Sequence, residues 1–391
     1  MTGSVDVLLR KITKLEKSSN SDAALEVLEH AILQFPDNPR LVRRHQSLRK
    51  DIIAAEVGEN PPPEVLRKLD IYSENASWHA LITASSMLLE VHPKSVALWN
   101  FKAVGERETG ALKQSEVSLK KAISINKNVA ASYVNLGNTL KEQGRIDEAI
   151  IQLRIGLKFD PNRAQGLNAL GNCLQELGQF DEARQMFEKA LQKDPTLTEA
   201  RYNLGGVRLQ NCEFETAWDL RESRWDRPVF KAQKAKYPQI QWSGSKVDRL
   251  LVWAEQGIGD EIMFASCLDE LALQANTLIV SVTGRSKPLF ERSFPNITFV
   301  DRDQTIAPTH YDHHVPAMTA IGMLRRSADS FASASFPYLQ PDQKRMRGLR
   351  EELAEASDGK QIIGISWFSK ARLVGEKRSI ALCVCLPEKM P

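Results

Sequence analysis

A unit of 34 residues occurs twice in succession in the middle of the chain. One copy spans residues 130–163 and the next spans 164–197, so equivalent residues lie 34 positions apart. The matching pairs are Leu136 and Leu170, Gly137 and Gly171, Gly144 and Gly178, Asp147 and Asp181, Ala149 and Ala183, and Pro161 and Pro195. A period of this length is typical of stacked helix pairs, and we predict such pairs here.

The residue types within the unit indicate two helices joined by a turn. Apolar residues at helical spacing, including Leu136, predict the buried face of a first helix. Gly137 lies where a side chain would hold two helices apart, and Gly144 suits the left-handed end of that helix. Asp147 is expected to cap the second helix, and Pro161 is expected to end it. Because these residue types recur at the same positions in both copies, the unit closely resembles a tetratricopeptide repeat.

Weaker copies extend the repeat in both directions along the chain. Residues 1–61 are expected to form degenerate repeat-like helices, and 62–231 the main array. The expected copies lie near 62–95, 96–129, 130–163, 164–197 and 198–231. In the last copy, Arg221 and Arg224 replace small or apolar residues, so the array is expected to end there. Trp218 and Trp225 either contact the next domain or belong to the core of the last helix pair.

Four asparagines recur at two positions of the predicted first helices. They are Asn135, Asn138, Asn172 and Asn203. An asparagine amide both donates to and accepts from an extended peptide backbone. The row resembles the asparagines that line the groove of repeat-bearing protein O-glycosyltransferases, which implies a groove for a protein partner or acceptor. The alternative is that these asparagines are ordinary solvated residues.

Composition excludes several classes of protein. The net charge of the 391 residues is only +3, which gives no basis for expecting a nucleic-acid partner. No apolar run reaches the length of about 18 residues that spans a bilayer, and no signal peptide is apparent. The five cysteines are sparse and odd in number, which argues against a disulfide framework. We therefore expect a cytoplasmic protein without a membrane span.

The pattern changes after an expected connector at 232–248. Short apolar runs that predict strands alternate with helical stretches over the following residues, 249–357. The predicted strands are 250–254, 277–282, 297–300, 311–315 and 361–367, and a charged helix is expected around 341–357. Strands that alternate with helices favour a parallel sheet with both faces covered.

Several motifs of this region resemble one family of enzymes. They are WSG at 242–244, LLVWAEQG followed by GIGDEI at 250–262, RSFPNI at 292–297, YDHH at 311–314 and PYL at 337–339. Together they resemble bacterial tetratricopeptide-repeat proteins that carry a family 9-like, heptosyltransferase-like glycosyltransferase domain. The resemblance implies a GT-B fold of two Rossmann-like halves, in which 249–357 is the first half. It also implies inverting, metal-independent transfer from a nucleotide sugar, with no cofactor.

The turn after the first predicted strand provides the candidate catalytic residues. By the resemblance, Asp260 matches the general base that takes the proton of the acceptor hydroxyl, and Glu261 is the adjacent alternative. The structural alternative is that Asp260 only caps a helix. Glu255, Gln256 and His314 are candidate substrate contacts. Candidate glycines also lie at this helix start, where outward N–H groups favour anionic ligands; they are Gly257 and Gly259.

The histidine-rich stretch at 310–314 does not predict a metal site. His313 and His314 point to opposite faces of a strand, so only Asp312 and His314 share a face. Two ligands on one side are too few for zinc. We therefore expect no metal.

Residues 358–391 resemble the start of the second half and then stop. By the resemblance, Ser366, Lys370 and Arg378 would approach the diphosphate of the donor. One strand and the short remainder cannot build a Rossmann-like half. The interpretation is a truncated glycosyltransferase-like protein, inactive alone, in which the repeats bind a protein or glycan acceptor. The alternative is a non-catalytic scaffold for protein–protein interaction.

Overall fold

The computed structural model describes all residues except 1–4, 18–20, 37, 53–59, 333–336 and 358–391. The chain divides into two compact units, Met1–Ala200 and Arg201–Pro391. The last expected repeat copy, 198–231, therefore lies almost wholly in the second unit.

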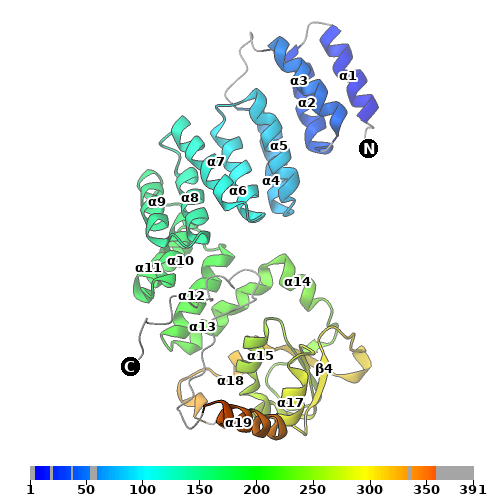
Figure 1. The fold of residues 1–391 in the computed structure, drawn as a ribbon, viewed down its shortest axis with the longest axis vertical. Helices are drawn as coiled ribbons and strands as arrows, with labels where there is room; N and C mark the ends of the chain where they lie inside the picture. The colour runs from blue at the N-terminus through cyan, green and yellow to red at the C-terminus, as the bar shows by residue number, and fades with distance from the viewer. Residues whose placement is uncertain (1–4, 18–20, 37, 53–59, 333–336, 358–391) are drawn as a thin grey trace. The chain divides into compact units, whose positions relative to one another are not determined.

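The first unit consists of helices that pack in consecutive pairs (Figure 1). Its helices are α1 (Val5–Lys17), α2 (Ser21–Gln34), α3 (Pro39–Ile52), α4 (Pro63–Glu74), α5 (Trp78–Val91), α6 (Val96–Glu108), α7 (Leu112–Ile125), α8 (Ala130–Glu142), α9 (Ile146–Phe159), α10 (Ala164–Glu176) and α11 (Phe180–Lys193). Each expected copy between 62 and 197 is one such pair. The 34-residue period thus correctly predicted the helical solenoid.

One position of the repeat has a left-handed backbone in five consecutive copies. The residues there, with their φ angles, are Ala76 (52°), Gly110 (84°), Gly144 (81°), Gly178 (75°) and Cys212 (60°). In each copy the next residue donates its N–H to a carbonyl near the helix end, as Arg145 does to Leu140 at 3.0 Å. This is the bond that closes a helix with a Schellman turn. The turn survives in copies that lack glycine, where a Cβ strains the backbone.

Replacing Cys212 by glycine is expected to raise the free energy of unfolding by about 1 kcal/mol, because glycine removes the strain of the left-handed conformation. Cys212 is exposed, so the substitution removes little packing. Urea denaturation measures the change. Cys212→Ala is the matched control, since it removes the thiol but keeps the strained Cβ. A gain with alanine as large as with glycine would contradict the backbone explanation.

The glycines inside the first helices allow their partner helices to approach closely. A Cβ added at Gly137 would lie 2.5 Å from Cγ of Leu153, and one at Gly171 would lie 2.6 Å from the Phe187 ring. The sequence prediction for these glycines is confirmed. The capping prediction for Asp147 is wrong, because Arg145 is the N-cap of α9 and makes no side-chain cap bond. Asp147 instead lies in the first turn, where its charge suits the helix dipole.

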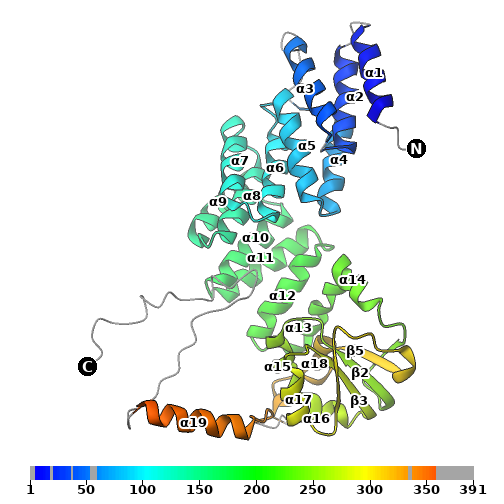
Figure 2. The ribbon, with the colours of Figure 1, turned by 45° about the vertical axis from the view of Figure 1, so that its right-hand side comes forward.

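The second unit combines the end of the repeat array with a small parallel sheet (Figure 2). Its helices are α12 (Thr198–Gln210, which begins in the first unit), α13 (Phe214–Arg221), η1 (Glu222–Asp226), α14 (Pro228–Lys234), α15 (Ile258–Ala265), α16 (Leu268–Ala272), α17 (Lys287–Ser293), η2 (Pro308–His310), α18 (Ala317–Leu324), η3 (Asp329–Phe331) and α19 (Gln343–Ser357). Its strands are β1 (Ile240–Gln241), β2 (Val247–Trp253), β3 (Ala275–Val282), β4 (Thr298–Asp301) and β5 (His313–Pro316). They are all parallel, in the order β1-β5-β2-β3-β4.

Alternate residues of the central strand bury against opposite faces of the sheet. Leu250 and Val252 of β2 belong to a core with α13, α15 and α18, whereas Leu251 and Trp253 belong to a second cluster on the other face. A side-chain period of two produces this separation. Both faces are covered, as the near-continuous apolar run predicts. A parallel sheet is thus confirmed for the C-terminal region, while its assignment to a GT-B half stays a prediction.

Tryptophans from the end of the repeat array pack on the sheet and its helices. The Trp218 indole contacts Gly322 and donates its Nε1–H to the Arg325 carbonyl at 2.7 Å. Trp225 packs against Trp253 with ring centroids 5.9 Å apart. Of the two sequence interpretations, contact with the α/β part is therefore the one confirmed. The segment 232–248, which was expected to be a connector, instead contains the end of α14, strand β1 and the start of β2.

Candidate functional site

The repeats of the first unit form a groove. It has a volume of about 980 Å³ and is lined by residues of α6, α7 and α8 and of the turns beside them. Its lining includes apolar side chains, namely Val96, Ala97, Phe101, Val104, Ile125, Val129 and Ala131. The groove also contains amides and cations. Its size and mixed lining suit a segment of chain rather than a single ion.

Two asparagine amides in the groove orient one another. The Nδ2 group of Asn100 donates to the Val96 carbonyl at 2.8 Å and to the Ser132 hydroxyl at 2.8 Å. Because that nitrogen faces a carbonyl, the Oδ1 atom of Asn100 points the other way and accepts a bond from Asn135 Nδ2 at 2.9 Å. Asn135 is therefore held with its own carboxamide oxygen directed away from Asn100.

The predicted asparagine row is only partly gathered in this groove. Asn135 lines it, whereas Asn138 and Asn172 do not belong to its lining and Asn203 lies in the second unit. Sequence reasoning missed Asn100, which lies 35 residues before Asn135 rather than 34 and so falls outside the recurring positions. The only signal in the sequence was an asparagine one residue away from the recurring position. Its significance becomes visible only when the packing of α6 beside α8 is known.

In the second unit, a buried arginine lies where the carboxyl ends of β2 and β5 meet. These neighbouring strands belong to opposite halves of the sheet order, and open α/β sheets bind ligands at such a point. The Arg224 side chain from η1 is 0% exposed there, and its partner Glu255, which follows β2, is also 0% exposed. The predicted acceptor contact Glu255 is therefore bound within the chain.

Arg224 uses all five of its N–H donors. It donates to the Glu255 carboxylate twice at 3.0 Å, to Thr319 at 2.7 Å, to Glu222 at 2.6 Å and to the Arg221 carbonyl at 3.1 Å. Burial raises the pKa of the Glu255 carboxyl, and the charge of Arg224 opposes that shift. The network joins the last repeat helix to the sheet, which is a structural role.

The candidate catalytic acids occupy the start of α15. Asp260 is half-buried and its Oδ2 accepts a bond from the Gly257 N–H at 3.2 Å, which is a capping contact. The Glu261 side chain is 1% exposed, and it accepts bonds from the Thr283 hydroxyl and the Ser286 hydroxyl, each at 2.6 Å. Glu261 thus ties α15 to the loop after β3. Catalysis by either residue stays a prediction.

The remaining candidates near the sheet are held by the chain itself. Gln256 donates from its side chain to the Met318 sulfur at 3.6 Å, and its carbonyl accepts a bond from Arg302. Gly257 and its neighbour Gly259 are exposed. His314 is buried and accepts a bond at Nδ1 from the Trp253 indole at 3.1 Å.

Burial lowers the pKa of His314, and the charge of Lys234 acts in the same direction. Because Nδ1 accepts the indole N–H, the proton of the neutral ring lies on Nε2. Tyr237 packs nearby, with its ring centroid 5.6 Å from that of His314. The His314 imidazole therefore packs among aromatic side chains on this face of the sheet.

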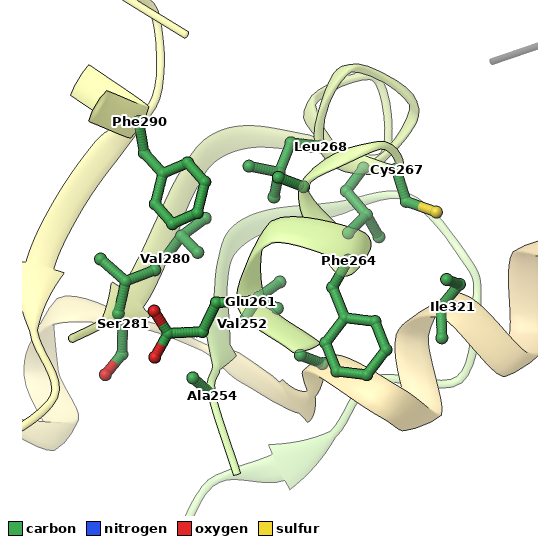
Figure 3. A pocket seen from close by; sticks show the side chains of 14 residues that line it. Val252, Ala254, Glu261, Phe264, Cys267, Leu268, Val280, Ser281, Phe290 and Ile321 are labelled. Atoms are coloured by element: carbon green, nitrogen blue, oxygen red, sulfur yellow. The ribbon is translucent and has the colours of Figure 1, made fainter. Parts of the chain in front are cut away.

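A small cavity lies between the sheet and α15 (Figure 3). Its volume is about 20 Å³, enough for roughly one water molecule. Phe264, Leu268 and Phe290 surround it, and the Glu261 carboxylate contributes to its lining. A cavity of this size is a packing void and holds no sugar or nucleotide.

Other features bear on metals, membranes and the donor site. Among the described residues, no group of three or more His, Cys, Asp and Glu side chains is placed to hold a metal ion. Asp312 pairs instead with Arg249 at 2.6 Å, and this bond lowers the pKa of the Asp312 carboxyl.

Among the helices that the structure describes, none is long and apolar enough to cross a membrane. The predicted donor contacts lie outside the described residues; they are Ser366, Lys370 and Arg378.

Family models of the tetratricopeptide repeat match two stretches of the chain. One match covers residues 118–151 and another covers 164–197. The match at 164–197 coincides with the helix pair α10 and α11, whereas the match at 118–151 begins within α7 and ends within α9. Each contains one of the left-handed turns that recur every 34 residues. The chain contains tetratricopeptide repeats, and proteins built from such repeats bind protein partners.

Among individual proteins, FlbA of Caulobacter vibrioides is 29% identical over 171 residues. The match covers 39% of this chain and 28% of FlbA, so the chain spans less than a third of that relative. The structure of MamA is similar over 43% of this chain and 97% of MamA, with 20% identity and a TM-score of 0.34. The structure of TTC0263 from Thermus thermophilus is similar over 52% of this chain and 98% of the TTC0263 chain, with 20% identity and a TM-score of 0.34.

Proposed function

We propose that the first unit is a docking module that holds an extended segment of a partner protein in the groove along α6 and α8. The observation that carries the proposal is the fixed Asn135 amide beside an apolar lining. The Oδ1 atom of Asn135 has no hydrogen-bond partner among the described residues, so it is free to accept a backbone N–H. Apolar side chains such as Phe101 and Val104 would contact the side chains of the same segment.

An asparagine whose orientation is already fixed favours binding. Asn100 holds the Asn135 amide through the Ser132 and Val96 contacts, so little side-chain entropy is lost when a peptide arrives. Main-chain bonds would provide affinity that tolerates many sequences, and the apolar lining would add selectivity. A scaffold of this type needs no chemistry in the second unit. Transfer of a sugar with Asp260 as base stays a prediction of the family resemblance.

The proposal is tested with the full chain and a library of random peptides of about 15 residues, each long enough to span the groove when extended. Peptides that bind are resynthesised and their affinities measured by fluorescence anisotropy. We expect Asn135→Ala to weaken binding about five- to tenfold, the effect of one lost hydrogen bond. Ala131→Trp, which places a large ring in the groove, should abolish binding.

The matched control is Asn162→Ala, which removes an exposed amide that does not line the groove. Circular dichroism checks that each variant keeps its helices. A library with no binder would overturn the proposal. Binders that are insensitive to Ala131→Trp would place the interaction elsewhere and would equally contradict it.

A further inference from the structure

We infer that the groove along α6 and α8 selects acidic protein segments, an inference that rests on the proposed docking function. Three cations line it: Lys94 in the turn after α5, Lys121 on α7 and Arg163 before α10. The lining contains no Asp or Glu. The groove therefore has a positive potential although the net charge of the chain is only +3.

None of the three cations has a carboxylate within ion-pair distance among the described residues. Other cations of the same repeats are paired, as Lys120 is with Glu116 at 2.7 Å and Arg145 is with Glu116 at 2.7 Å. Lys120 and Lys121 are sequence neighbours on one helix, yet only the one outside the groove has a partner. Other exposed cations of this unit, such as Lys189 on α11, also lack an ion pair among the described residues, but the groove gathers three unpaired cations with no acidic side chain in its lining.

The Arg163 side chain indicates the geometry of the missing group. Its Nε atom is buried and has no hydrogen-bond partner among the described residues. The Nε atom is covered by the protein itself, so a carboxylate in the groove would bind the terminal nitrogens of the Arg163 guanidinium. Arg163 directly precedes α10, whereas Asn135 lies on α8. The acidic side chain that meets Arg163 would therefore belong to a different part of the bound segment from the backbone N–H that meets Asn135.

The rest of the lining favours a protein segment over another polyanion. Phe101, Val104 and Ile125 contribute apolar surface between the cations. A peptide that alternates acidic and apolar side chains complements both features, whereas a sugar–phosphate backbone would leave the apolar surface uncovered. Charge complementarity would mainly set specificity and the rate of association.

The experiment uses acidic peptides from the library, each compared with a version in which every Glu and Asp is replaced by its amide. We expect the amide versions to bind about tenfold more weakly. Raising the salt concentration from about 50 mM to about 500 mM should weaken only the acidic peptides, because screening acts on charge. Arg163→Glu and Lys121→Glu should each weaken the acidic peptide about tenfold and leave the amide version within about twofold.

Lys189→Glu is the matched control, because it makes the same charge change at an exposed position of α11 away from the groove. It should alter the affinity by less than about twofold. Amide versions that bind as tightly as the acidic peptides, while Ala131→Trp still abolishes binding, would overturn the charge inference and leave the docking function standing. A library without binders would overturn both. Single-stranded RNA that competes at equal affinity would also contradict selection of an acidic protein segment.

Discussion

Replacing Arg224 by alanine should lower the free energy of unfolding of the second unit by about 3–5 kcal/mol, because it leaves the Glu255 carboxylate buried without its cation. Both side chains are 0% exposed and share two bonds of 3.0 Å. Thr319 and Glu222 lose a donor as well. Urea titration followed by hydrogen exchange of β2 and β3 peptides measures the loss in the second unit alone.

Arg326→Ala is the matched control for this experiment. Arg326 also forms a short ion pair, with Asp219 at 2.7 Å, but that pair is exposed and should contribute less than about 1 kcal/mol. The double variant Arg224→Met with Glu255→Gln should recover part of the loss, since no charge then remains buried. An Arg224→Ala variant as stable as Arg326→Ala would show that the network does not hold the sheet to the last repeat helix.

Gly171→Val is expected to destabilise the first unit by about 3 kcal/mol, because α10 and α11 approach too closely for a side chain at this position. An added Cβ would lie 2.6, 2.8 and 2.9 Å from three atoms of the Phe187 ring. Phe187 is fully buried, and a rigid ring moves aside less readily than a flexible side chain. Thermal unfolding followed by circular dichroism measures the effect.

Shortening the opposing residue provides the control. The double variant Gly171→Val with Phe187→Ala makes room for the new methyl groups and should lose less stability than the sum of the two single variants, although Phe187→Ala by itself costs stability. Simple additivity of the two losses would contradict a steric clash. The equivalent pair of the preceding copy, Gly137 and Leu153, is also 16 positions apart, so the result bears on that copy as well.

The two interpretations of this protein concern different units. Docking requires the groove of the first unit, whereas sugar transfer requires the carboxyl edge of the sheet in the second. At that edge Arg224 and Glu255 satisfy one another, and Glu261 is bound to the Thr283 and Ser286 hydroxyls. The groove, in contrast, has an amide oxygen and three cations that are not used within the described chain. This difference is why the docking function is the one proposed.

Local and periodic features were determined by the sequence alone. The 34-residue period predicted the helix pairs, and Gly144 and Gly178 marked their left-handed turns because only the local backbone decides that conformation. The parallel sheet also followed from short apolar runs separated by helices. The local rule failed at Asp147, since the N-cap of α9 is Arg145, two residues earlier, and it makes no side-chain cap bond.

Only the tertiary structure decided what the polar side chains contact. Arg224 and Glu255 are 31 residues apart, and each is a charged residue type that is usually exposed at the protein surface. Asn100 and Asn135 meet because consecutive repeats stack, with an offset that the period itself does not contain. The unpaired state of Lys121 beside the paired Lys120 depends on which side of α7 each faces. Such contacts join residues far apart along the chain, and packing rather than local preference selects them.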